Sequence, residues 1–104
     1  MLFRSSIPAW EKPENYGGLA FTDPVAEVKR ELRGIQADVV IVIAHTGLDR
    51  DPKTGVVRPV PDLPNENLAY QIASEVPGID AVIFGHTHSE VAEYRVGKDR
   101  KSVV

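Results

Sequence analysis

The chain has 104 residues, enough for one domain, and its 42% hydrophobic and 26% charged residues are typical of a soluble globular protein. Its formal net charge of −3 gives no reason to expect nucleic acid or an acidic membrane surface as a partner. The absence of cysteine excludes disulfides and thiolate metal sites, so any metal must be held by nitrogen and oxygen. No segment of the sequence predicts a transmembrane helix or a signal peptide.

Both ends of the chain are expected to be non-native. Residues 99–104 read as the translation of a widely used sequencing-library adapter, and residues 1–5 match the end of its partner adapter. We therefore expect the native sequence to be residues 6–98 and the parent protein to be longer at both ends.

Residues 6–20 are interrupted by proline and glycine and predict an ordered loop, with Trp10 among its aromatic anchors. A helix is expected next, because Asp23 can cap the first turn and Pro24 suits the first helical position. Apolar residues at helical spacing predict one stripe that packs on a sheet, and the charged residues, Glu27 among them, are expected to form a solvated face.

Residues 39–44 give the strongest strand prediction, since they are apolar throughout and rich in β-branched side chains. A run that is apolar at every position, such as residues 81–84 further along the chain, is typical of a strand buried on both faces, as in a parallel sheet. Residues 48–64 then contain too much proline for a helix or a central strand. The basic residues of this loop could meet a phosphate, although solvated charges are favoured; they are Arg50, Lys53 and Arg58.

Asn65 is the predicted cap of a second helix, which ends near Val76 before a proline and a glycine. A second apolar strand covers residues 79–84, and a last strand is expected over residues 91–96. This order implies a right-handed crossover between two parallel strands, the first ending at His45.

Each histidine of the chain follows a predicted strand. His45 follows the first strand, whereas His86 and His88 follow the second with one residue between them. Side chains two residues apart in extended backbone point to the same side, and neighbouring parallel strands end at the same edge of a sheet. We therefore expect three imidazoles on one rim, where they could bind a divalent transition metal.

The residues also carry a resemblance to a known family. The chain is similar to the later part of a calcineurin-like metallophosphoesterase domain, in the branch of bacterial 5′-nucleotidases and 2′,3′-cyclic-nucleotide 2′-phosphodiesterases. The segments that carry the resemblance are Ala44-His45-Thr46-Gly47, Glu66-Asn67-Leu68-Ala69, Val76-Pro77-Gly78-Ile79-Asp80 and Gly85-His86-Thr87-His88. The fold that it implies is α/β, part of a four-layer αββα sandwich, here roughly β-α-β-β after an N-terminal loop and helix. Residues 6–98 would be the C-terminal portion of the catalytic domain.

By the same resemblance, His45 and His86 would bind the second ion of a dinuclear centre and His88 the first. Two divalent ions, manganese, zinc or iron, would orient a nucleotide phosphoester and produce a hydroxide nucleophile. Asp49 is a candidate outer-shell partner of a metal-binding imidazole, although a water-facing aspartate is favoured. The implied partner is a small nucleotide, with no nucleic-acid polymer, membrane or protein implied, and the implied location is the periplasm, the cell surface or the outside of a bacterium.

The earlier motifs of the family, Asp-x-His, Gly-Asp-x-x-Asp and Gly-Asn-His, do not occur in this sequence. We therefore assign no catalytic residue and predict that these 104 residues alone have no phosphoesterase activity. One alternative is a metal-dependent amidohydrolase, although its His-x-His pair normally lies on the first strand of a barrel. The other is an inactive α/β fragment that exposes an apolar sheet face.

Overall fold

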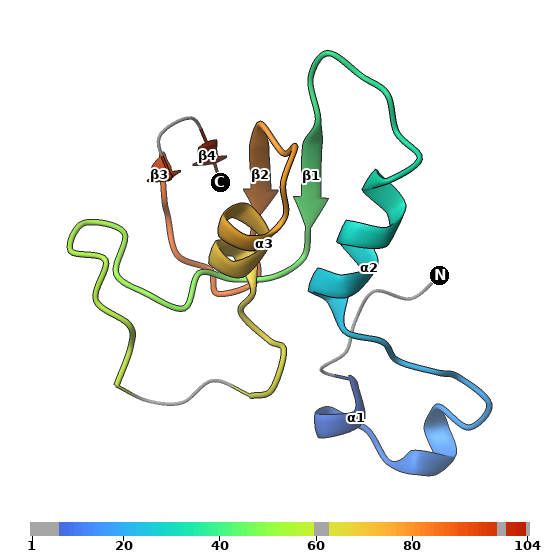
Figure 1. The fold of residues 1–104 in the computed structure, drawn as a ribbon. Helices are drawn as coiled ribbons and strands as arrows, with labels where there is room; N and C mark the ends of the chain where they lie inside the picture. The colour runs from blue at the N-terminus through green and yellow to red at the C-terminus, as the bar shows by residue number, and fades with distance from the viewer. Residues whose placement is uncertain (1–6, 60–62, 98–99, 104) are drawn as a thin grey trace.

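The computed structural model describes residues 7–59, 63–97 and 100–103, and Figure 1 shows the arrangement of their elements. The helices are α1 (Ile7–Trp10), α2 (Pro24–Leu32) and α3 (Ala69–Glu75), with a short 3-10 helix, η1, at Pro13–Asn15. The strands are β1 (Ile41–Ala44), β2 (Ala81–Phe84), β3 (Tyr94–Val96) and β4 (Arg100–Val103). These strands form one sheet in the order β1-β2-β4-β3, in which β3 alone runs antiparallel to its neighbour. The predicted α/β class is confirmed.

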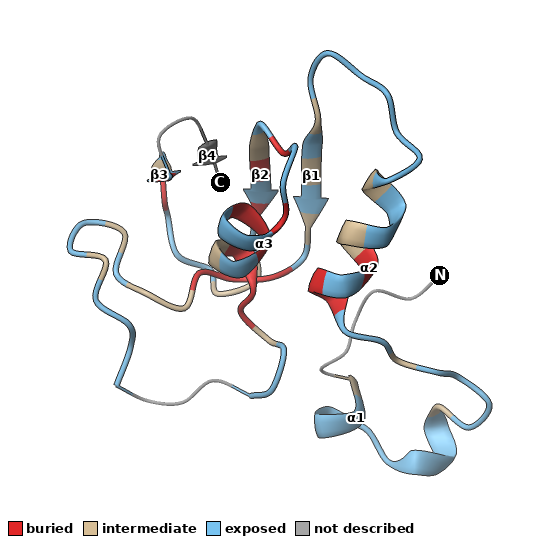
Figure 2. Ribbon diagram, in the orientation of Figure 1, coloured by how far each residue is buried: buried red, intermediate tan, exposed pale blue. Residues whose placement is uncertain are grey.

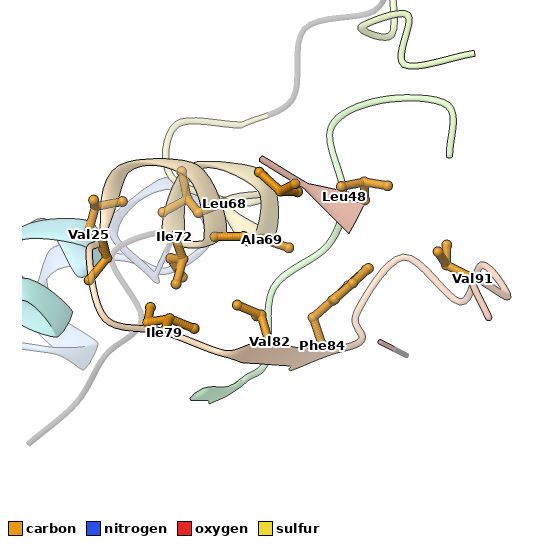
Figure 3. Close-up of a cluster of buried hydrophobic side chains, with 12 residues drawn as sticks. Val25, Leu48, Leu68, Ala69, Ile72, Ile79, Val82, Phe84 and Val91 are labelled. Carbon is orange, nitrogen blue, oxygen red and sulfur yellow. The ribbon is translucent and has the colours of Figure 1, made fainter. Parts of the chain in front are cut away.

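One face of the sheet is covered by α3, which lies across β2 in Figure 1. Val82 on β2 is fully buried there, and Phe84 is almost so. Figure 3 shows how side chains from α3 and β2 meet in one apolar cluster. Its members are Val25, Leu48, Leu68, Ala69, Ile72, Ala73, Val76, Ile79, Val82, Phe84, Val91 and Val96. The core therefore lies on a single side of the sheet.

The opposite face of β1 and β2 is exposed, as Figure 2 shows most clearly along β1. Ile41 is 54% exposed, Ile43 80% and Ile83 37%. Burial alternates along both strands because the described helices pack on one side only. Ile83 on β2 is exposed, so the prediction that residues 81–84 are buried on both faces is wrong for this chain. The expected apolar sheet face is present.

Helix α2 begins as predicted. The Asp23 carboxylate accepts the backbone N–H of Val25 at 3.0 Å, and Pro24 occupies the first turn. The helix packs against α3. Glu27 is buried and forms an ion pair with Arg30 at 2.6 Å, so the predicted solvated face is wrong at this position.

Helix α3 begins later than predicted, and Asn65 does not cap it. Asn65 has a φ of 60°, whereas the first helical residue is Ala69. Two N–H groups at the start of the helix, which have no partner within it, are satisfied by the segment that follows β1. The Thr46 hydroxyl accepts the N–H of Leu68 at 2.7 Å, and the Gly47 carbonyl accepts that of Ala69 at 3.1 Å. A distant segment therefore supplies the cap.

The two ends of the sequence also differ from expectation. The predicted N-terminal loop contains α1 and η1, and Trp10 is 63% exposed, so it does not act as an anchor. At the other end, β4 comes from residues expected to be non-native and lies between β2 and β3. Its backbone pairs with the edge of β2, since an open edge offers unpaired N–H and C=O groups. Among the described helices, none has the length and apolar character to cross a membrane.

Candidate metal centre

His45 and His86 come together at the carboxyl edge of the sheet. They follow β1 and β2, which are parallel neighbours paired from Ile41 with Ala81 onwards. The Nδ1 atom of His86 lies 3.2 Å from the Nε2 atom of His45, and the ring centroids are 5.0 Å apart. One ring nitrogen of each histidine therefore faces the other.

This separation suits two ligands of one ion. Metal–imidazole distances of about 2.0–2.1 Å place two nitrogens about 2.9–3.4 Å apart in octahedral or tetrahedral geometry. The observed 3.2 Å lies within that range and is also a hydrogen-bond distance. The donor set, two imidazoles and no thiolate, fits manganese, iron or zinc.

Glu66 contacts the outer side of the same pair. Its Oε1 atom lies 3.0 Å from the Nε2 atom of His86, and its Oε2 atom accepts the backbone N–H of Leu63 at 3.2 Å. The hydrogen bond with His86 holds the pKa of Glu66 below its usual value, against the opposing effect of burial. Glu66 belongs to the motif Glu66-Asn67-Leu68-Ala69, but no role was predicted for it. The signal that could have identified it is an acidic side chain shortly before the helix that crosses from β1 to β2.

His88 does not join the pair. It is exposed and has a φ of 55°, while His86 has a φ of 116°. The segment after β2 is therefore not extended, and the premise that both side chains point to the same side is wrong. Across residues 7–59 and 63–97, no group of three or more His, Cys, Asp or Glu side chains could hold a metal ion. Two of the three predicted ligands are thus brought together.

Asp49 is neither an outer-shell partner of an imidazole nor a water-facing residue. Its carboxylate binds Arg50 at 2.8 Å and 3.2 Å, and the Arg50 guanidinium lies 3.3 Å from the centre of the Tyr70 ring. The Asp49 carboxylate raises the pKa of Arg50 above its usual value. Arg58 donates to the carbonyl of Leu48. Arg50 is thus largely shielded from water, which corrects the prediction of a solvated charge at this position, whereas Lys53 and Arg58 are exposed as predicted.

A close contact fixes the loops beneath the two histidines. A Cβ atom added to Gly47 would overlap the amide of Asn67 and the methyl group of Thr87. Gly47 is buried, and only hydrogen fits at its α-carbon. The segments after β1 and β2 are thereby held close to the start of α3.

A cavity of about 750 Å³ opens beside the histidine pair. Its polar end is formed by His45, Thr46, Glu66 and His86. The remaining wall is mostly apolar and comes from α1, α2, β1 and α3. A small molecule could therefore place a charged group at the histidines and an uncharged body along the wall.

The family model described as Calcineurin-like phosphoesterase matches residues 4–90. The chain therefore belongs to the calcineurin-like phosphoesterase family, and the predicted resemblance is confirmed. This membership favours the phosphoesterase interpretation over the amidohydrolase alternative.

Individual similar proteins have names that are more specific than that of the family. A 2′,3′-cyclic-nucleotide 2′-phosphodiesterase/3′-nucleotidase from Salmonella typhimurium is 39% identical over 87 residues, which is 80% of this chain and 12% of the relative. One of the same name from Yersinia enterocolitica is 35% identical over 86 residues, with the same coverage. A Staphylococcus aureus protein described as a 5′-nucleotidase, solved in complex with alpha-ketoglutarate, superposes with a TM-score of 0.72 at 29% identity. That match covers 98% of this chain and 20% of the other, so the chain spans a small part of each relative.

Proposed function

We propose that this chain is part of the catalytic domain of a metal-dependent phosphoesterase that hydrolyses nucleotide phosphoesters. The reaction would be of the 5′-nucleotidase or 2′,3′-cyclic-nucleotide 2′-phosphodiesterase/3′-nucleotidase type. The observation that carries the proposal is the facing pair of His45 and His86, 3.2 Å apart at the ends of neighbouring parallel strands, in a chain of this family. The names of the relatives support a nucleotide substrate.

The proposed ligand roles follow the resemblance. His45 and His86 would hold one divalent ion, and His88 would bind the other together with residues from outside this chain. The ions would supply Lewis acidity and lower the pKa of a bound water. The chain's own contribution is to bring one ring nitrogen of each histidine to the same place and to hold their backbone there through Thr46 and Gly47. We assign no proton-transferring residue within this chain.

The cavity beside the histidines supports a small-molecule substrate. Its volume of about 750 Å³ is in the range of ligand pockets, which is about 300–1,000 Å³. A phosphate group at the polar end would lie against the histidine pair. A nucleoside would then extend along the apolar wall. No nucleic-acid polymer, membrane or protein partner is part of the proposal, and we further propose that the parent enzyme acts in the periplasm, at the cell surface or outside a bacterial cell.

The test uses the full-length protein, recovered by reading outward from residues 6–98 in the source DNA. The purified protein is stripped with a chelator and assayed on 5′-AMP, 3′-AMP and 2′,3′-cyclic AMP after addition of manganese, zinc or iron. We expect hydrolysis that depends on the added metal. His45→Ala and His86→Ala should each lower kcat/KM at least about 100-fold, since a lost ligand disorders the ion.

The matched control is Glu75→Gln, a change at an exposed position of α3 away from the histidines. It should leave activity unchanged. A folded full-length protein that binds no metal and hydrolyses none of the three substrates would overturn the proposal.

A further inference from the structure

The two nitrogens of His86 have different partners. Nδ1 faces Nε2 of His45 at 3.2 Å, whereas Nε2 faces Oε1 of Glu66 at 3.0 Å. A neutral imidazole carries one proton, and an ionised carboxylate can only accept a hydrogen bond. The proton of His86 must then lie on Nε2, which leaves the Nδ1 lone pair directed at His45.

We infer that Glu66 is a positioning residue that fixes Nδ1 as the metal-binding nitrogen of His86. The inference rests on the proposed function, because it assigns a role at the same metal site. Carboxylates that accept the second N–H of a ligand imidazole fix its tautomer and orientation and raise its basicity. The side chains of Glu66 and His86 are 16% and 29% exposed, so this contact is largely shielded from water.

Glu66 is itself held from two directions. Its Oε2 atom accepts the N–H of Leu63, and its backbone carbonyl accepts the Thr46 hydroxyl at 2.8 Å. Because Thr46 directly follows His45, the same hydroxyl links the backbone of one ligand to that of the positioning residue. The carboxylate therefore has a defined place relative to both histidines.

The contact with Glu66 also helps to hold an unfavourable backbone conformation at His86. A φ of 116° is costly for a residue with a side chain, about 1–3 kcal/mol, and persists only where contacts impose it. The hydrogen bond to Glu66 is one such contact. A change at Glu66 should therefore alter the orientation of His86 and not only the local charge.

The experiment compares metal binding by full-length wild-type protein with Glu66→Ala and Glu66→Gln. Glutamine keeps an oxygen that can accept the Nε2 proton but lacks the charge, so it tests orientation separately. Glu75→Gln removes a charge at the last residue of α3 and leaves the histidines and Glu66 unchanged. The affinity for one equivalent of Zn²⁺ is measured by competition with a chromophoric chelator, and the ligand field is measured from the absorption spectrum of Co²⁺.

We expect Glu66→Ala to weaken Zn²⁺ affinity about 10–100-fold and to change the Co²⁺ spectrum. Glu66→Gln should recover most of the affinity, and Glu75→Gln should match the wild type. A folded Glu66→Ala protein that keeps wild-type affinity and an unchanged Co²⁺ spectrum would overturn the inference.

A crystal structure of the metal-loaded wild-type protein keeps the inference testable if Glu66→Ala does not fold. We expect Nδ1 of His86 to bind the ion and Nε2 to donate a hydrogen bond to Glu66. Coordination through Nε2 would overturn the inference even if metal binds. Wild-type protein that binds no metal would instead contradict the proposed function, so the two failures are distinguishable.

Discussion

The two faces of the sheet carry similar aliphatic side chains but differ in what covers them. Val42 and Val82 lie side by side on the face that packs on the core, whereas Ile43 and Ile83 lie side by side on the face that no described helix covers. Full burial of an isoleucine contributes about 1.5–3 kcal/mol, so the bare face forgoes several kcal/mol. The fold implied by the family resemblance has a second sheet at this position. A strand that is apolar at every residue is therefore buried on one face only in this chain.

The strongest test places the same charge on each face. In the 104-residue chain, Val82→Asp should abolish cooperative unfolding, because a buried, unpaired carboxylate costs several kcal/mol. Ile43→Asp should change the free energy of unfolding by less than about 0.5 kcal/mol and raise solubility. Thermal unfolding followed by circular dichroism measures both.

The same two variants in the full-length protein test whether a second sheet covers Ile43. If a second sheet covers Ile43 there, Ile43→Asp should become destabilising, while Val82→Asp remains so. Equal damage by both changes in the 104-residue chain would contradict the bare face and would show that it is buried in solution.

A smaller effect is expected where the loops under the histidines meet the covered side. Gly47→Ala should lower the free energy of unfolding by about 1–3 kcal/mol, because the new methyl group overlaps Asn67 and Thr87. Gly85→Ala is the control, since nothing lies near its added Cβ and its φ is not positive. Denaturant titration of the two variants gives the comparison. Equal stabilities would mean that the Gly47 contact relaxes without cost.

The Thr46 hydroxyl tests how firmly α3 is attached to the end of β1. Thr46→Val leaves the buried N–H of Leu68 without its acceptor and should cost about 1–2 kcal/mol. Thr46→Ser keeps both hydrogen bonds and should recover most of that loss. Amide hydrogen exchange at Leu68 measures the effect locally. Similar exchange rates in the two variants would show that the hydroxyl does not protect the Leu68 amide.

The smallest effect belongs to a turn that contributes to neither face. Asp51 accepts the N–H groups of Lys53 at 2.7 Å and Thr54 at 2.9 Å, and these bonds, that of Thr54 foremost, lower the pKa of Asp51 below its ordinary 3.8. The turn is therefore stabilised above pH 3.8 and loses that stabilisation as the pH falls through the lower, folded-state value.

The measurement is the pH dependence of the Lys53 and Thr54 amide chemical shifts. Asp51→Ala should abolish this dependence and leave the amide of Val82 unaffected. A titration midpoint at or above the ordinary value would contradict the expectation.

The sequence indicated much of this structure. The Asp23-Pro24 cap, the strand that ends before His45 and the family were all predicted correctly, because each depends on neighbouring residues or on a contiguous motif. The cap of α3 could not be predicted, since Thr46 supplies it from more than twenty positions earlier. The role of His88 stays a prediction.

The site was predicted in part for the same reason. The contact between His45 and His86 was predicted from their places at the strand ends, because neighbouring parallel strands end at the same edge of a sheet. The contact of Glu66 with His86 depends on the path of the crossover and on a positive φ at His86, which no local pattern revealed. The side on which the sheet is covered depends on how the helices pack and cannot be read from an apolar strand.

The Thr46 hydroxyl also bears on how fast the proposed metal site would take up an ion. Because it links the segment of His45 to that of Glu66 by hydrogen bonds within the protein, the two imidazoles are arranged before any ion arrives. Uptake would then be limited by the loss of water from the ion and not by the ordering of the chain. Divalent ions that exchange water at different rates should enter this site in that order, whatever their final affinities.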